Sequence, residues 1–445
     1  MLALAAAPLT EPVLRPQIDK LVAAVSAARR LPYHGTLPVR ALGRDEMARA
    51  TALAVGEGSD NPAARTEDEI LRRLGLVPAG ATAGELAART YALAASPIAR
   101  YDATTGTLLV PSFLPFEAQR TEIAHEIAHA VADQRFGLRG FLRIASEGES
   151  RLDGDETRAR LAIVEGDALL AGLELGDPQE GFLGMHPLAA LAARLRGASA
   201  AGAPGWFEAL GELTHVDGLL FVAGVRAHRP FAAVDALWKD PPASTEQILH
   251  PEKYDACEAP IAVETAALPT LPGFGRPSGS DVLGEWAVRT WLAGALSPEI
   301  AARAAAGWGG DRAGIYTPEP AAPAADGGAA PPALAPLAWL TVWDGPAEAD
   351  DFARAALQRL AKLARTDAPD DDGGHAVFRT PAGAFALARR DDVVALLAGA
   401  PEPAGPALDA MLDAVRPRAN RRGAPRPRRA AQPGCPRRDR AAAPG

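Results

Sequence analysis

The sequence has little cysteine, few aromatic residues and no long apolar run. Its 445 residues include two cysteines, Cys257 and Cys435, which form no CxxC pair and exclude a cysteine-ligated zinc site. No stretch of about 18 apolar residues occurs, so we expect no integral membrane segment. The N-terminus is apolar for eight residues but lacks the basic region of a signal peptide, and it fits the remnant of a longer export signal.

Positive charge is also scarce over most of the chain. The first 415 residues carry 36 basic and 54 acidic side chains, a net charge of −18, whereas ten arginines and one acid follow from Arg416 onward. An acidic body of this size argues against nucleic acid as a partner. The hydrophobic fraction of 48% is that of a globular protein, so the chain can bury a core without disulfides.

The strongest signal for chemistry is an HExxH motif, His125 to His129, within a helix predicted over 116–136. Histidines four residues apart lie on one face of a helix, so both imidazoles can bind one Zn²⁺ at about 2.0–2.1 Å. Glu126 is turned about 100° from His125, which puts it within reach of a zinc-bound water but not of the metal. The spacing therefore predicts two zinc ligands and a general base, with one zinc ion per chain.

A catalytic zinc takes three protein ligands, and the third must lie outside the motif because no HExxHxxGxxH continuation exists. The best candidate is Glu165, since a carboxylate within the apolar run LAIVEGDALL needs a partner. Gly166 beside it would let two helices approach closely. Glu156 and Asp167 are alternative ligands, and a surface position for Glu165 is the competing interpretation. Asp167 is expected to point away from Glu165 and orient a neighbouring group.

The segment HEIAHAVADQ resembles the zinc helix of thermolysin-like gluzincin metallopeptidases, in which HExxH is followed by AV and then by Asp, here Asp133. The resemblance implies a zincin-like fold and a third ligand, a Glu, on the next helix, where Glu165 stands. An acid four residues after that Glu belongs to the gluzincin pattern, and Leu169 occupies its place here. Four segments resemble a little-characterised family of predicted bacterial and archaeal metallopeptidases: ARYDATTGTLLV, VEGDA, PPASTEQILHPEKY and AAAGWGGDR. Members of that family are often exported, which favours an exported protein over a cytoplasmic one.

The segment PPASTEQILHPEKY, at 241–254, supplies two further candidates. Peptide hydrolysis needs hydrogen-bond donors aimed at the developing oxyanion, and in gluzincins a His or Tyr from a later segment commonly provides one. His250 and Tyr254 are therefore candidate catalytic residues. The alternative is a structural loop in which His250, held extended by the following proline, bonds to the backbone. His215 is expected to be structural or exposed, as are the other isolated histidines.

Hydrophobic periodicity and turn residues predict an α+β protein. Its parts are the HExxH helix, a small N-terminal sheet with an edge hairpin at 97–111, a largely helical second half and a small C-terminal α+β portion. We expect an N-terminal helix or export-signal remnant at 1–30, a zinc-binding catalytic subdomain at 31–175, a helical subdomain completing the cleft at 176–315, an α+β portion at 316–405 with a Pro/Ala-rich loop at 317–336, and a disordered Arg/Pro-rich tail at 406–445.

These patterns favour a zinc-dependent metallopeptidase that hydrolyses peptide or protein substrates, with Glu126 as general base. The alternative is a non-catalytic zinc-binding protein that uses the same scaffold to bind a partner or a cell-envelope component. Glu126 favours the enzyme, because a structural zinc site has no use for a general base. The sequence predicts no oligomeric state.

Overall fold

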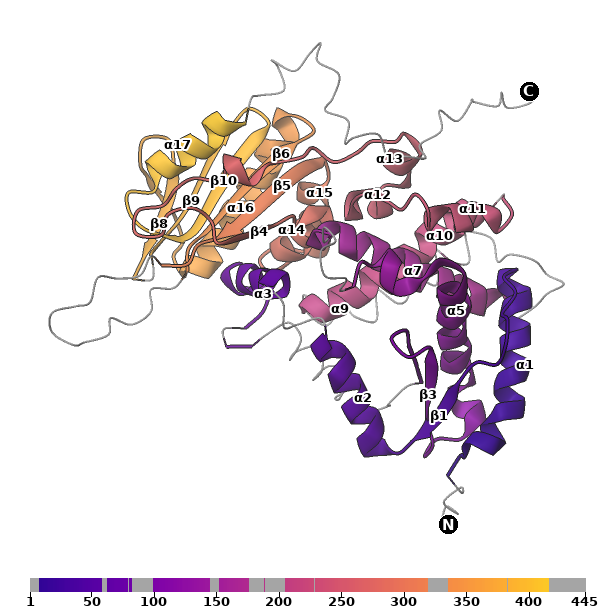
Figure 1. Ribbon diagram of the computed structural model, residues 1–445. Helices are drawn as coiled ribbons and strands as arrows, with labels where there is room; N and C mark the ends of the chain where they lie inside the picture. The colour runs from indigo at the N-terminus through magenta and orange to yellow at the C-terminus, as the bar shows by residue number, and fades with distance from the viewer. Residues whose placement is uncertain are drawn as a thin grey trace, which may run out of the picture.

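The computed structural model describes residues 8–57, 62–78, 80–81, 99–144, 152–175, 188, 205–227, 229–318, 335–381 and 383–415. The fold is α+β and contains a three-stranded sheet and a seven-stranded sheet. Figure 1 shows the small sheet beside α5 at one end of the molecule and the large sheet at the other, with helices between them. Among the described helices, none combines the length and the apolarity needed to cross a bilayer.

The N-terminal unit packs three helices against a small sheet. Its elements are α1 (Glu11–Arg29), β1 (Val39–Leu42), α2 (Arg44–Glu57), β2 (Arg100–Asp102), β3 (Thr107–Pro111), η1 (Phe116–Gln119), α5 (Arg120–Phe136) and α6 (Leu138–Phe141). Strand β3 is central, parallel to β1 and antiparallel to β2, so β1 and β2 are the two edge strands. Leu14, Ile18 and Val25 of α1 are fully buried against α5, which places α1 in the same core as the HExxH motif.

The middle of the chain is helical. Its elements are α7 (Gly154–Glu174), α9 (Trp206–Gly211), the π-helical turn η2 (Glu212–Asp217), α10 (Gly218–Arg226), α11 (Ala232–Leu237), α12 (Thr245–Leu249), α13 (Pro251–Asp255) and η3 (Thr265–Ala267). Three short helices, α12, α13 and η3, lie within residues 240–275. Ser244 begins α12 by accepting a hydrogen bond from Gln247 N, and Pro251 begins α13, where its missing N–H costs nothing.

The C-terminal unit is a seven-stranded antiparallel sheet with helices on both faces. Its elements are α3 (Pro62–Arg73), β4 (Gly279–Asp281), α14 (Gly284–Ala293), α15 (Pro298–Ala305), β5 (Trp308–Ile315), β6 (Leu337–Trp343), α16 (Pro346–Ala364), β7 (Asp370–Asp371), β8 (Ala376–Thr380), β9 (Gly383–Arg390), β10 (Val393–Ala400) and α17 (Gly405–Ala414). The strand order is β4-β5-β6-β10-β9-β8-β7. Helix α16 covers one face and α17 the other, so β6 and β10 are buried throughout and read as continuous apolar runs.

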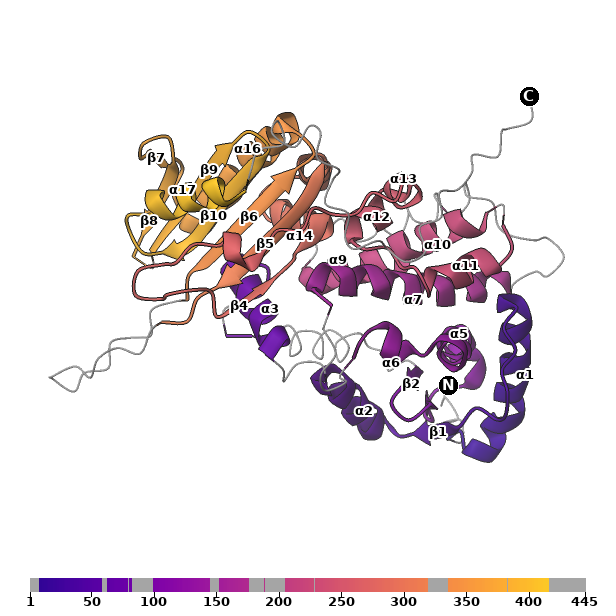
Figure 2. The ribbon, with the colours of Figure 1, turned by 45° about the horizontal axis from the view of Figure 1, so that its top comes forward.

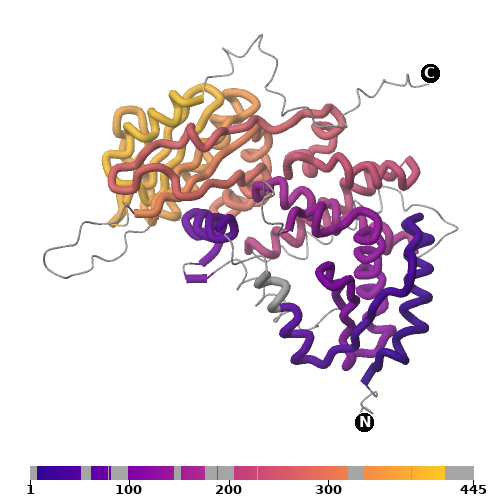
Figure 3. The backbone as a smooth tube through the Cα atoms, viewed as in Figure 1, coloured from indigo at the N-terminus to yellow at the C-terminus, as the bar shows by residue number. Residues whose placement is uncertain are grey.

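Three expected boundaries differ from the structure. The boundary at residue 315 falls inside the large sheet, because β5 pairs with β6. Helix α3 lies within the expected 31–175 subdomain but packs against β4 and β5, as Figures 2 and 3 show. The tail expected to be disordered from 406 begins with α17, whose Leu408, Met411 and Leu412 are buried against the sheet. Most of the 317–336 loop and the chain from 416 lie outside the described residues.

Candidate metal centre

Helix α5 carries the HExxH motif and is fixed at its C-terminal end by local chemistry. It stops at Gly137, whose φ of 76° is left-handed and whose N–H donates to Asp133 O. Ile123, Ile127 and Val131 are fully buried, so one face of α5 packs into the N-terminal core. Figure 2 shows α5 surrounded by α1, α6, α7 and the small sheet, all of which contact it.

The structure brings His125, His129 and Glu165 together as a group able to hold a metal ion. His125 Nε2 lies 3.1 Å from Glu165 Oε2 and 3.0 Å from His129 Nε2, and His129 Nε2 lies 3.4 Å from Glu165 Oε2. Ligand atoms on a tetrahedral zinc with bonds of about 2.0–2.1 Å are separated by about 3.3–3.4 Å. The three donor atoms therefore have nearly the spacing of one face of a zinc coordination sphere.

Glu165 is presented by α7, which begins when Asp153 accepts a hydrogen bond from Glu156 N. A glycine pair then sets the position of the next helix. A Cβ added at Gly166 would lie 2.4 Å from Gly218 O, so only glycine permits this approach. We expected Gly166 to allow close approach of the HExxH helix and the helix of Glu165. The structure places the close approach elsewhere, because Gly166 faces Gly218 of α10, which carries η2 against α7.

The charges of the triad are coupled. Burial alone would lower the pKa of His129, but the Glu165 carboxylate outweighs it and raises that pKa to about 9. Burial would likewise raise the pKa of Glu165, whereas positive charge on His129 and hydrogen bonds from the two imidazoles hold it well below its usual value. A metal ion needs neutral imidazole, so a bound cation would take the place of the proton that His129 otherwise holds.

Glu126 lies beside the triad without belonging to it. Its Oε2 accepts a hydrogen bond from the backbone N–H of Tyr101 at 2.6 Å, which ties α5 to the edge strand β2. Burial raises the pKa of Glu126, and nearby His129 and His125 offset part of that rise. A carboxylate with a raised pKa beside a metal-ligand set is suited to accept and release a proton.

His215, which we expected to be structural or exposed, also reaches the site. Its Nε2 lies 3.5 Å from Glu165 Oε2, and its ring stacks on His125 with centroids 6.2 Å apart. Its Nδ1 lies 2.9 Å from the Thr214 hydroxyl and 3.1 Å from the carbonyl oxygen of Gly211, which hold the ring in place. About half of the side chain is exposed, and His215 therefore borders the triad from the solvent side.

The two candidates from the 241–254 segment have other partners. His250 Nε2 lies 2.9 Å from Glu285 Oε1, and the Tyr254 hydroxyl donates to Asp240 O at 2.8 Å. Elsewhere in the segment, Thr245 Oγ1 donates to the buried carboxylate of Asp155 at 2.5 Å. These contacts hold the segment against α7 and α14. The structure does not group His250 with His125, His129 and Glu165.

The alternative ligands are engaged in ion pairs. Glu156 accepts from Arg160 at 2.9 Å. Asp167 accepts from Arg29 Nε at 2.5 Å, from Arg29 Nη2 at 3.0 Å and from Trp238 Nε1 at 3.0 Å. Arg29 is 1% exposed and also donates to Asp235. As expected for a residue two positions from Glu165, Asp167 orients another group, here the arginine that ends α1.

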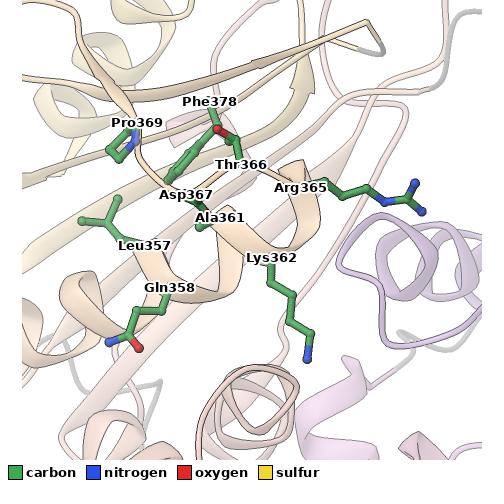
Figure 4. Close-up of a pocket in the computed structure, with 9 residues that line it drawn as sticks. All are labelled: Leu357, Gln358, Ala361, Lys362, Arg365, Thr366, Asp367, Pro369 and Phe378. Atoms are coloured by element: carbon green, nitrogen blue, oxygen red, sulfur yellow. The ribbon is translucent and has the colours of Figure 1, made fainter.

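A cavity of about 450 Å³ lies elsewhere, between the end of α16 and β8. Leu357, Pro369 and Phe378 give it apolar walls, while Lys362 and Arg365 extend away from them (Figure 4). Because these cations do not converge and Lys362 Nζ donates to Gly294 O, the cavity offers no arrangement for chemistry. Helix α16 and strand β8, which line it, belong to the large-sheet unit, at the other end of the molecule from α5 (Figures 1 and 2).

Comparison with known proteins bears on the C-terminal unit. Residues 271–414 match the protein family described as Domain of unknown function (DUF8575). That range holds the large sheet with α14 to α17, and α5 and α7 lie outside it. No curated protein and no solved structure matches the chain.

Proposed function

We propose that this protein is a zinc-dependent metallopeptidase with a zincin-like catalytic unit, in which His125, His129 and Glu165 hold the metal. The observation that carries the proposal is the triangle of donor atoms, 3.0 to 3.4 Å on its sides, with the carboxylate of Glu126, held by Tyr101 N, next to it. Two histidines and a carboxylate are the donor set of known catalytic zinc sites. A purely structural site would need a fourth protein ligand and no adjacent base.

Each residue has a role that follows from its place. A bound zinc ion would supply Lewis-acid chemistry, polarising the scissile carbonyl and acidifying a water molecule. Glu126 accepts the proton of the attacking water and passes it to the leaving amine, which its raised pKa favours. His215 presents Nε2 at the rim of the triad, where a proton on this nitrogen can be donated to the developing oxyanion.

The substrate is a peptide in an extended conformation. Strand β2 is an edge strand of its sheet and contacts α5, so a peptide can add beside it next to Glu126. His250 is less well placed for the oxyanion role that its sequence context favours, because its Nε2 is engaged by Glu285.

The decisive experiment combines metal analysis with a peptide-library cleavage assay. We expect about one zinc per chain in the wild type and in Glu126→Gln, and cleavage only by the wild type, with a loss of about 10²–10⁴ in rate. His215→Asn should keep zinc and lose rate, whereas His250→Asn, the matched control, should keep both. Equal cleavage by wild type and Glu126→Gln would refute the mechanism. Zinc binding without any cleavage would favour the non-catalytic alternative.

A further inference from the structure

Tyr101 is attached to α5 at two points. Its backbone N–H donates to Glu126 Oε2 at 2.6 Å, and its hydroxyl donates to Asp133 Oδ2 at 2.7 Å. Glu126 and Asp133 are seven positions apart, or about two helical turns. The residue therefore lies along α5, with its backbone at the candidate base and its side chain at the helix end.

Asp133, which accepts the hydrogen bond from the Tyr101 hydroxyl, is itself held by a second contact. Asp133 Oδ1 accepts a hydrogen bond from Leu138 N at 2.6 Å, which fixes the turn from α5 into α6. The ring of Tyr101 packs against two hydrophobic clusters, the N-terminal core that includes α1 and α5 and the core of the helical middle of the chain. Burial and the Asp133 carboxylate raise the pKa of Tyr101, so its hydroxyl stays protonated and continues to donate.

The hydrogen bond from the Tyr101 backbone N–H decides which oxygen of Glu126 is available to accept a proton. A carboxylate on a helix can rotate about its side-chain bonds, and an immobilised base transfers protons better than a mobile one. Oε2 is held by Tyr101 N, which leaves the other oxygen to accept a proton. Because β2 is short and lies at the edge of its sheet, its own pairing with β3 holds it only weakly.

We propose that Tyr101 is a positioning residue: the bond from its hydroxyl to Asp133 holds β2 against α5, so that its backbone N–H fixes the orientation of Glu126. This inference rests on the proposed peptidase function for its catalytic consequence. The contact itself belongs to the protein alone and can be measured without substrate or metal.

The test compares Tyr101→Phe with Tyr33→Phe. Tyr33 packs in the same cluster near the same carboxylate, but in the described part of the chain no hydrogen bond joins its hydroxyl to Asp133. The first readout is hydrogen exchange of the Tyr101 amide, followed by NMR in the metal-free protein. An outer-strand amide facing solvent exchanges fast, so we expect protection in the wild type and Tyr33→Phe, and at least a tenfold loss in Tyr101→Phe.

The second readout is steady-state kinetics of the zinc-loaded protein. We expect Tyr101→Phe to keep its zinc and its KM while kcat falls about tenfold, and Tyr33→Phe to match the wild type. Asp133→Asn, which replaces a charge-assisted hydrogen bond by a neutral one, should give a smaller loss in both readouts. It also covers the case in which Tyr101→Phe does not fold.

The outcomes separate the two proposals. Unchanged amide protection in Tyr101→Phe would overturn the positioning role whether or not the protein cleaves peptides. Unchanged kcat with lost protection would overturn its catalytic consequence. If the wild type cleaves nothing while the amide behaves as expected, the peptidase function fails and the attachment of β2 stands.

Discussion

Replacing Gly166 by alanine should destabilise the protein, although alanine is normally the better helix residue. In an exposed helix, replacing glycine by alanine increases the stability by about 0.5–1 kcal/mol. Here the new Cβ would lie 2.4 Å from Gly218 O and 2.5 Å from Gly218 C, which are backbone atoms that cannot rotate away. Overpacking of this kind costs about 1–3 kcal/mol, so we expect a net loss of about 1–2 kcal/mol.

Gly172 provides the matched control on the same helix, because a Cβ added there meets nothing within 4 Å. Gly172→Ala should therefore stabilise the protein by about 0.5–1 kcal/mol. Urea unfolding followed by far-UV circular dichroism measures both changes. Gly166→Ala should also lower kcat, because the displaced α10 moves η2 and with it His215. Equal stabilities of the two variants would refute the close approach of α7 and α10.

Three further predictions concern the triad and its support. Glu165→Gln should weaken zinc binding by more than about 100-fold in a chelator competition, and a Kd close to that of the wild type would exclude Glu165 as a ligand. The pKa of His129 is raised from 6.5 to about 9 on folding, so the metal-free protein should lose stability as pH rises from about 6.5 to 9. Urea unfolding with chelator tests this, and calorimetry in two buffers should show about one proton released per zinc near pH 7.5. Arg29→Met leaves the buried Asp167 without its ion pair and should lower the free energy of unfolding, measured by thermal unfolding, by about 3–5 kcal/mol, whereas Arg29→Met combined with Asp167→Leu should lower it less.

Local sequence patterns were sufficient to identify His125, His129 and Glu165 as the residues that the structure groups together. The HExxH spacing predicts a helix face, and residues 120–136 form that helix with Gly137 at its end. Glu165 was identifiable because a carboxylate inside an apolar helical run needs a partner. The grouping of the three donor atoms follows from these two helices packing side by side.

Long-range contacts account for what the sequence could not reveal. His215 reaches Glu165 only because Gly166 and Gly218 let α10 lie close to α7, and no local motif marks a π-helical turn. His250 looked catalytic from its motif, yet its partner is Glu285, a buried acid 35 residues away. In the tail, the arginines and prolines dominate the composition and hide the short apolar helix α17.

The pairing of Arg29 with Asp167 has a consequence for the order in which the protein folds. The two residues are 138 positions apart, and Arg29 also reaches Asp235, 206 positions away. Closing loops of this length costs conformational entropy before any contact repays it, which makes such contacts slow to form. The helix that presents Glu165 therefore acquires its final support only when the first and the middle thirds of the chain have met. We expect the metal centre to mature late, after its flanking helices have formed.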